Sequence, residues 1–308
     1  MKKTVFIDGA AGTTGLRIHE RLAARTDIEL LILPEETRKD NAARREALNT
    51  ADIAFLCLPD AAAVEAVAMI ENDRTAVIDT STAHRTAPGW AYGFPELTGR
   101  RAAVAASRRI ANPGCHATGF IALVEPLRQA GVLARDAELS AFSVTGYSGG
   151  GKKMIAEYEG EGRDPLFDAP RQYGIGQTHK HLPEMRVIAD IERSPVFCPI
   201  VAPFYSGMEV TVPLHAGQVG ANVEELIALY KQYYQNGLVR VCEQADEGGF
   251  LSAAAFSGRD DLGISVHGNG DRILLVARFD NLGKGASGAA IQNMNILLGA
   301  DEATGLTV

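Results

Sequence analysis

The chain has 308 residues, which is more than one hydrophobic core usually accommodates, so we expect two domains. Hydrophobic residues make up 46% and charged residues 22%, a balance that excludes global disorder. The chain has 30 Lys and Arg against 38 Asp and Glu, a net charge of −8. Proteins that grip nucleic acid by its phosphates are normally basic, so no nucleic-acid partner is expected.

No stretch approaches the roughly 18 apolar residues that a membrane helix needs, and Asp8 interrupts the first apolar run before a signal peptide could form. The cysteines are far apart and contain no Cys-x-x-Cys pair. Neither a disulfide framework nor a metal site is therefore indicated. We expect no membrane partner, no bound metal and a cytoplasmic, reducing environment. The four cysteines are Cys57, Cys115, Cys198 and Cys242.

The first third of the chain alternates between apolar strands and helices. Strands are predicted at 4–8, 28–33, 52–58, 75–79 and 102–106, and helices at 14–24, 42–48 and 61–70. Strands that are apolar on both faces and separated by helices are typical of a parallel sheet covered on both sides. The pattern predicts an α/β fold with a Rossmann-type doubly wound domain.

The pattern changes beyond about residue 115. Longer, alternating strands and Gly-rich segments follow, as in an α+β domain with a mixed or antiparallel sheet. A closing helix is predicted at 286–298, ending at Gly299.

The first motif opens helix one directly after strand one: Gly9, Gly12 and Gly15, with Thr13 and Thr14 between them. Such glycines let the backbone approach a pyrophosphate, to which the helix N-terminus offers N–H groups. The GxxGxxG spacing departs from GxGxxG, so a simple strand-to-helix turn is the alternative.

The segment after strand two decides the cofactor type. Basic side chains there favour the 2′-phosphate of NADP, and acidic ones favour the ribose of NAD. Arg38 and Lys39 predict NADP, although Glu35 and Glu36 precede them. The alternative is that all four charges lie on a solvated loop.

The segment at 111–119, ANPGCHATG, places a cysteine at a helix start. Asn-Pro-Gly forms a turn, and the apolar run that follows predicts a buried helix that Pro126 could kink. At a helix N-terminus the dipole and N–H groups stabilise a thiolate and, later, an oxyanion. A cysteine is more often a small buried apolar residue, but this placement favours Cys115 as a nucleophile.

NPGCHATG resembles the active-site segment of the N-acetyl-γ-glutamyl-phosphate reductases, which are relatives of the aspartate-semialdehyde dehydrogenases. Further resemblances follow in the family's order, with short gaps like those of its compact subgroup. Two departures concern substrate details: STAHR replaces the commoner SADFR, and His116 follows the cysteine where Tyr is frequent. The matching segments are GAAGTTG, IDTSTAHR at 78–85, YGFPEL at 92–97, TGYSGGGKK at 145–153, HKHLPEM at 179–185 and DNLGKGASGAAIQNMN at 280–295.

The resemblance implies an NADP-dependent acyl-phosphate reductase of arginine biosynthesis. N-acetyl-γ-glutamyl phosphate would form a thioester with Cys115, releasing phosphate, and NADPH would reduce it to N-acetylglutamate 5-semialdehyde. It also implies a homo-oligomer, a dimer or a tetramer. The dinucleotide-binding domain would comprise residues 1–114 plus 284–308, and residues 115–283 would form the catalytic and oligomerisation domain.

His179 and His181 are the candidates for proton transfer. On a strand, residues two apart face the same side, and an imidazole pKa near 6.5 suits acid/base work. By resemblance His179 is the better candidate, and Glu184 binds or orients the substrate. A zinc site built on the two histidines would lack a partnered ligand cluster.

Substrate anions need cations and donors. The resemblance implies Arg85 as the ligand for phosphate or substrate carboxylate, which suits its bidentate geometry; a surface arginine is the alternative. Ser148 could offer donors together with the glycine run, and Lys152 could add charge.

The resemblance also implies cofactor contacts away from the glycine motif. The segment before the last helix would contact the nicotinamide side, where small residues permit close approach. An ordinary loop and helix cap is the alternative. The residues so implied are Ser81, Asn281, Lys284 and Gly285.

Two other functions compete. The same chemistry could act on an aspartyl or aminoadipyl phosphate, although HKHLPE argues against the aspartyl version. A non-catalytic NADP-binding regulator would need none of Cys115, His179 and Arg85, so their joint presence argues against it.

Overall fold

The computed structural model describes residues 2–308. The chain divides into two compact units. The first contains the chain up to Pro113 together with Ala286–Leu306, and the second contains Gly114–Gly285 and Thr307–Val308.

The first unit is built on a parallel sheet of six strands in the order β2-β1-β3-β4-β6-β5. Since β2 and β3 lie on opposite sides of β1, the strand order reverses there, and doubly wound folds bind ligands beyond such a switch point. The strands are β1 (Lys3–Asp8), β2 (Ile28–Leu31), β3 (Ile53–Leu56), β4 (Ala76–Asp79), β5 (Ala91–Tyr92) and β6 (Arg109–Ala111). The helices are α1 (Thr13–Ala23), α2 (Asn41–Thr50), α3 (Asp60–Ala68), α4 (Arg100–Ala106) and α9 (Gly288–Leu298).

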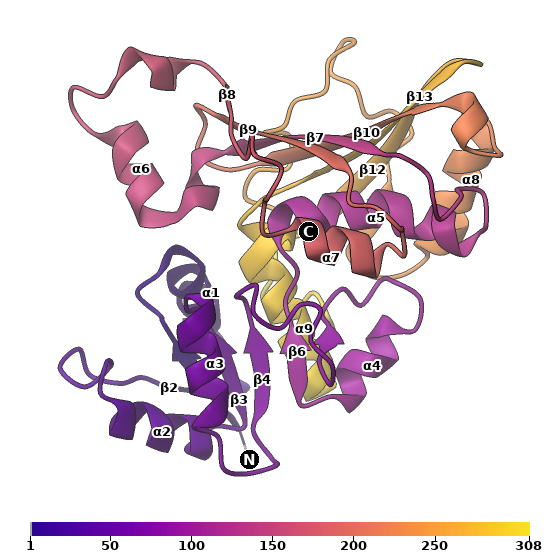
Figure 1. Cartoon of the computed structure of the whole chain (residues 1–308). Helices are drawn as coiled ribbons and strands as arrows, with labels where there is room; N and C mark the ends of the chain where they lie inside the picture. The colour runs from indigo at the N-terminus through magenta and orange to yellow at the C-terminus, as the bar shows by residue number, and fades with distance from the viewer. Residues whose placement is uncertain (1) are drawn as a thin grey trace. The chain divides into compact units, whose positions relative to one another are not determined.

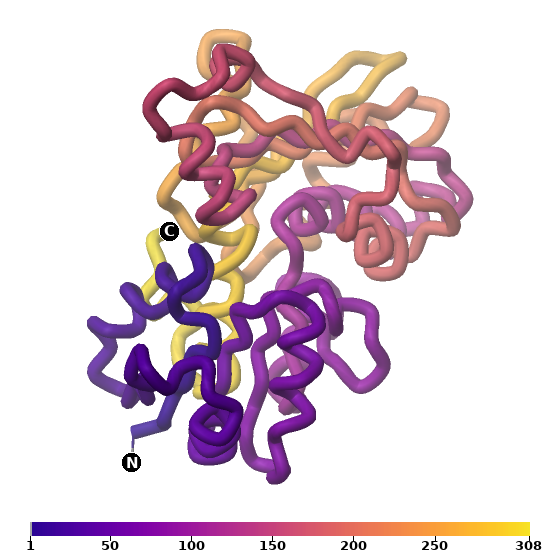
Figure 2. The backbone as a smooth tube through the Cα atoms, turned by 60° about the vertical axis from the view of Figure 1, so that its left-hand side comes forward, coloured from indigo at the N-terminus to yellow at the C-terminus, as the bar shows by residue number. Residues whose placement is uncertain are grey.

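Helices cover both faces of this sheet. Val5 and Ile7 of β1 pack in one apolar cluster with residues of α1, α4 and α9, whereas Phe6 packs in a second cluster with residues of α2 and α3. The alternation of side chains along β1 therefore supplies two cores. α9, from the end of the chain, lies beside the N-terminal strands, as its yellow tube shows in Figure 2. The doubly wound α/β prediction is confirmed.

The predicted strand at 102–106 is wrong, because these residues belong to α4. Alanine is the strongest helix former, and Val104 is the one buried side chain of this segment. The fifth buried strand follows as β6, and the short β5 was not predicted.

The second unit has a mixed sheet of seven strands in the order β11-β12-β13-β10-β7-β9-β8. The pairs β7–β9 and β11–β12 are parallel and the others antiparallel, which confirms the predicted mixed sheet. The strands are β7 (Ser140–Gly146), β8 (Arg171–Gln172), β9 (Val196–Ala202), β10 (Met208–His215), β11 (Val239–Val241), β12 (Leu262–Gly268) and β13 (Arg272–Phe279). The α-helices are α5 (Cys115–Gln129), α6 (Gly151–Glu159), α7 (Leu182–Ile188) and α8 (Val223–Tyr233).

α5 is the central helix of this unit. It packs on β10 and β13, and α7 lies on the same side of the sheet, below the strands in Figure 1. Its residues from His116 to Leu127 are all buried, and the helix continues through Pro126 to Gln129. The sheet and α7 thereby hold α5, and with it the first turn of the helix, in place.

Candidate active site

Cys115 is the first residue of α5, and Gly114 is its N-cap, as the turn-then-helix pattern predicts. The backbone N–H of Gly114 donates to Glu184 Oε2 at 3.2 Å, and the Thr118 hydroxyl donates to the Gly114 carbonyl at 3.0 Å. No acidic residue lies in the first turn of α5. Because Cys115 is the first residue of α5, its thiol lies at the positive end of the helix dipole. This position stabilises a thiolate.

The two histidines lie in a turn before α7, not on a strand, and His181 is the N-cap of that helix. Pro183, at the start of α7, suits a helix N-terminus rather than a strand, because its missing N–H needs no partner there. The turn still brings the two rings together, with centroids 4.7 Å apart. The His181 N–H donates to His179 Nδ1 at 3.2 Å, so a neutral His179 carries its proton on Nε2.

His116, Ser143 and Tyr173 complete the surroundings of the cysteine. His116 Nδ1 lies 2.7 Å from Ser143 Oγ, and its Nε2 lies 2.6 Å from the Tyr173 hydroxyl. The sequence motifs assign no role to any of these three residues. His116 could have been found from its place beside Cys115, whereas Ser143 and Tyr173 come from distant segments that carry no such signal.

The predicted substrate residues of this unit differ in their settings. The Glu184 carboxylate is buried and already holds the Gly114 N–H, which favours a role in fixing the turn. Ser148 is buried and its Oγ accepts from Asn281 Nδ2 at 3.0 Å. Lys152 is exposed on α6.

Three of the predicted cofactor residues also lie in the second unit. Asn281 Oδ1 accepts from the Gly207 N–H at 2.9 Å, so both ends of its amide are engaged. Lys284 is buried. Gly285 approaches the cysteine so closely that an added Cβ would lie 2.9 Å from Cys115 Cβ.

In the first unit the glycine motif forms the turn between β1 and α1. Gly9 has φ +85°, and a Cβ there would lie 2.3 Å from the Cys57 carbonyl oxygen; one at Gly15 would lie 2.4 Å from the Gly9 oxygen. Only glycine fits such a turn. The Oγ1 atom of Thr13 is shielded from solvent and has no hydrogen-bond partner in the described residues.

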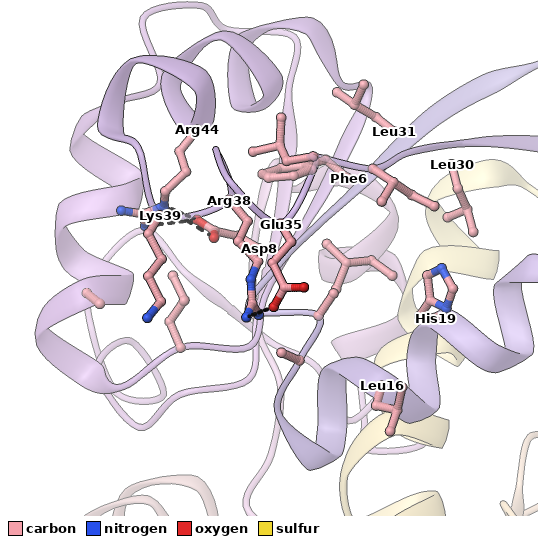
Figure 3. A pocket seen from close by; sticks show the side chains of 18 residues that line it. Phe6, Asp8, Leu16, His19, Leu30, Leu31, Glu35, Arg38, Lys39 and Arg44 are labelled. Carbon is pink, nitrogen blue, oxygen red and sulfur yellow. Dashed lines mark hydrogen bonds and ion pairs between the residues drawn. The ribbon is translucent and has the colours of Figure 1, made fainter.

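A pocket of about 590 Å³ opens beside this turn (Figure 3). Gly9 lines it, together with Arg38 and Lys39. Arg38 forms an ion pair with Glu35 at 2.9 Å. The tight turn, the unpartnered Thr13 hydroxyl oxygen and the two cations fit a phosphorylated dinucleotide.

A buried ion pair forms one wall of the pocket. The Arg44 guanidinium donates to the Asp8 carboxylate, with Nη2 2.9 Å from Oδ2, and both side chains are buried (Figure 3). The pair joins the end of β1 to α2. It therefore supports the strand that carries the glycine turn.

Arg85 and Ser81 lie in the loop that follows β4. The buried Arg85 guanidinium donates to the Asn112 carbonyl at 3.0 Å and to the Thr80 carbonyl at 3.1 Å. The Ser81 hydroxyl donates to Asp79 at 2.7 Å. Arg85 thus joins the segments after β4 and β6, so it is not the surface arginine of the alternative reading.

Cys57 differs from Cys115 in its setting. It follows β3, and burial raises the pKa of its thiol to about 12. It is therefore a poor nucleophile at neutral pH. All four cysteines are thiols.

Within residues 2–308, no group of three or more His, Cys, Asp or Glu side chains is placed to hold a metal ion. The same residues include no helix that is both long enough and apolar enough to span a membrane.

A doubly wound domain, a mixed-sheet domain and a cysteine that begins a helix define a protein of the semialdehyde dehydrogenase type. Two protein-family models match accordingly. Residues 4–105 match the semialdehyde dehydrogenase NAD binding domain, and residues 115–281 match the semialdehyde dehydrogenase dimerisation domain.

Curated relatives show which family within this class the chain is similar to. The chain is 46% identical to an N-acetyl-γ-glutamyl-phosphate reductase of Sinorhizobium fredii, over 97% of this chain and 100% of the relative. It is 47% identical to N-acetyl-γ-glutamyl-phosphate reductase 2 of Pseudomonas putida, with 98% of each chain covered. The chain belongs to the N-acetyl-γ-glutamyl-phosphate reductase family.

Solved structures agree on the fold. Aspartate semialdehyde dehydrogenase II of Vibrio cholerae superposes with a TM-score of 0.75 at 18% identity, covering 97% of this chain and 98% of that one. The enzyme of Candida albicans, solved with NADP, gives a TM-score of 0.63 at 16% identity, covering 97% and 99%.

Proposed function

We propose that this protein reduces N-acetyl-γ-glutamyl phosphate to N-acetylglutamate 5-semialdehyde and phosphate with NADPH, as a step of arginine biosynthesis. The observation that carries the proposal is the cysteine at the start of α5, followed by His116, whose ring packs against those of His179 and His181, in a chain of this family. The proposed cofactor and the four cysteines, which are thiols and form no disulfide, suit a cytoplasmic enzyme.

Cys115 is the proposed nucleophile. Its thiolate attacks the acyl carbon and a C–S bond forms. The bond between the acyl carbon and the bridging phosphate oxygen breaks, and phosphate leaves with the electron pair. The product of this step is a thioester. The N-terminal N–H groups of α5 stabilise the thiolate before attack and the oxyanion formed during it. When bound, NADPH supplies the hydride that reduces the thioester.

His179 is the proposed acid/base. Its Nδ1 is engaged by the His181 N–H, so Nε2 is the atom proposed to exchange a proton with the substrate oxygen. His181 and Glu184 are proposed to hold this arrangement, since one donates to His179 and the other accepts from Gly114. Arg85, Ser148 and Lys152 are the proposed ligands of the phosphate and carboxylate groups.

NADP is the proposed occupant of the pocket beside the glycine turn. The backbone N–H groups at the start of α1 would hold the pyrophosphate, with Thr13 and Thr14 beside it. Arg38 and Lys39 would hold the 2′-phosphate. Arg38 would exchange its ion pair with Glu35 for this contact. We assign Ser81, Asn281, Lys284 and Gly285 to the nicotinamide side.

The dinucleotide-binding domain is proposed as 1–114 plus 284–308, and the catalytic and oligomerisation domain as 115–283.

The open face of the second sheet is the proposed contact with a second copy of the chain. α5 covers the opposite face, whereas this one leaves apolar side chains exposed: Phe142, Val196 and Leu274 are 45%, 58% and 41% exposed. Exposed apolar patches on a sheet mark association sites. The region matches a family model described as a dimerisation domain. A dimer, or a tetramer made of two dimers, would bury this face.

Sedimentation tests this contact. Phe142→Glu should convert the oligomer to monomers, and Val64→Glu, an equally exposed apolar position on α3, should leave it intact. An unchanged oligomer in Phe142→Glu would rule out this face.

The reaction itself is tested in the reverse direction. N-acetylglutamate 5-semialdehyde, NADP and phosphate should give NADPH, which is followed by the absorbance of the reduced nicotinamide. Omission of phosphate should abolish the signal. Activity without phosphate, or with aspartate semialdehyde in preference, would contradict the proposal.

A further inference from the structure

His116 lies at the centre of the side chains around the cysteine. Its ring is 3% exposed and packs edge-on against His179, with centroids 5.5 Å apart and an interplanar angle of 85°. It is tilted against His181 at 5.6 Å and meets Phe197 edge-on at 5.3 Å. A single ring therefore touches both of the histidines assigned to the chemistry.

Hydrogen bonds hold this ring at both nitrogens. Ser143, on β7, lies 2.7 Å from Nδ1, and the Tyr173 hydroxyl lies 2.6 Å from Nε2. A neutral imidazole has one donor and one acceptor, and a hydroxyl can serve as either. Both bonds therefore form in either tautomer, and the ring cannot turn about χ2 without losing them.

The ring is uncharged at neutral pH. Burial, together with the neighbouring His179, lowers the pKa of His116 to about 3. Burial raises the pKa of Tyr173, and the negative charge of Cys115 adds to that rise. The titratable groups that face His116 are thus Cys115, His179, His181 and Tyr173, while β7 and β9 contribute the uncharged Ser143 and Phe197.

We propose that His116 is a positioning residue: Ser143 and Tyr173 fix its ring, and the ring in turn fixes the orientation of His179 for proton exchange with the substrate. The need for such a support follows from the turn that carries His179, which is neither helix nor strand. The χ2 torsion of histidine is broad, so a backbone turn alone does not orient the ring. The inference rests on the proposed acid/base role of His179.

Kinetics of three variants test the proposal. Ser143→Ala and Tyr173→Phe each remove one of the two hydrogen bonds and keep the other. Each should lower kcat roughly tenfold and change KM by less than about twofold, because proton transfer depends on geometry more than binding does. The double variant should lose less than the product of the two losses, since both act through one ring.

Tyr234→Phe is the matched control. It removes another buried tyrosine hydroxyl, one that donates to the Ala122 carbonyl of α5 at 2.8 Å, far along the helix from Cys115. It should lower the melting temperature without changing kcat. Losses of kcat that are equal in all three single variants would overturn the proposal.

Histidine NMR gives a readout that needs no activity. In the wild type the His116 ring should stay neutral from pH 9 to about pH 5, and Tyr173→Phe should shift the titration of His179. A His116 that titrates near its ordinary value, or a His179 titration that is identical in Tyr173→Phe, would overturn the inference. If instead the wild type shows these titrations but no phosphate-dependent reduction, the proposed function fails and the ring arrangement stands.

Discussion

A methyl group placed at Gly285 should disturb the nucleophile directly. The Cβ of Gly285→Ala would lie 2.9 Å from Cys115 Cβ, 3.2 Å from the Asp280 carbonyl oxygen and 3.2 Å from Phe279 Cε2. Ordinary contacts begin at 3.4 Å, so the shortfall at Cys115 is 3.4 − 2.9 = 0.5 Å. Phe279 is fully buried, which leaves little room for relief on that side. Overpacking of this kind costs about 1–3 kcal/mol of stability.

The same shortfall sets the expected loss of activity. A displacement of about 1 Å at reacting atoms can cost roughly 10²-fold, so half that displacement predicts about a tenfold fall in kcat. Gly217→Ala is the control, because its Cβ would meet nothing within 4 Å. The assay is phosphate-dependent reduction of NADP, with a thermal melt of each variant. A Gly285→Ala enzyme that matched Gly217→Ala in both kcat and melting temperature would refute the reasoning.

Two further predictions concern the cofactor and pH. Arg38→Ala should weaken NADPH binding about 5- to 150-fold, the effect of losing about 1–3 kcal/mol, and leave NADH binding unchanged. Arg45→Ala, which removes a side chain that pairs with Glu71, is the control and should change the binding of neither cofactor. Equal affinities of the wild type for NADPH and NADH would contradict the assignment. Because burial holds the pKa of His116 near 3 in the folded chain against 6.5 when unfolded, the unfolded chain takes up an extra proton below pH 6.5. Stability should therefore fall by up to about 1.4 kcal/mol per pH unit as the pH drops from 6.5. Urea midpoints at pH 7 and pH 5 should differ less in His116→Gln, and an identical difference would count against a buried neutral ring.

Local patterns explain what the sequence could predict. Residues that are close together in the sequence determine the continuous apolar strands and the glycine turn after β1. They also determine the start of α5 after Asn-Pro-Gly. Each depends on propensities and caps within a few positions. The segment 102–106 was predicted wrongly because its alanines and single valine show no clear hydrophobic period. The high helix propensity of alanine favours the helix that these residues form.

Contacts between distant segments could not be predicted in this way. Tyr173 reaches His116 across 57 residues, and Asn281 reaches Ser148 across 133. The spacing of His179 and His181 predicted adjacent rings on a strand, whereas a turn and a helix cap bring them together. Tertiary packing determines such arrangements, and a short motif does not record it.

The thioester on Cys115 is the central claim, and mass spectrometry of the intact protein tests it most directly. Incubation with N-acetyl-γ-glutamyl phosphate in the absence of NADPH should add one N-acetylglutamyl group, located on the peptide that contains Cys115. Hydroxylamine should remove it, and Cys115→Ala should show no adduct while still binding NADPH. An adduct on Cys57, Cys198 or Cys242, or full activity in Cys115→Ala, would contradict the account.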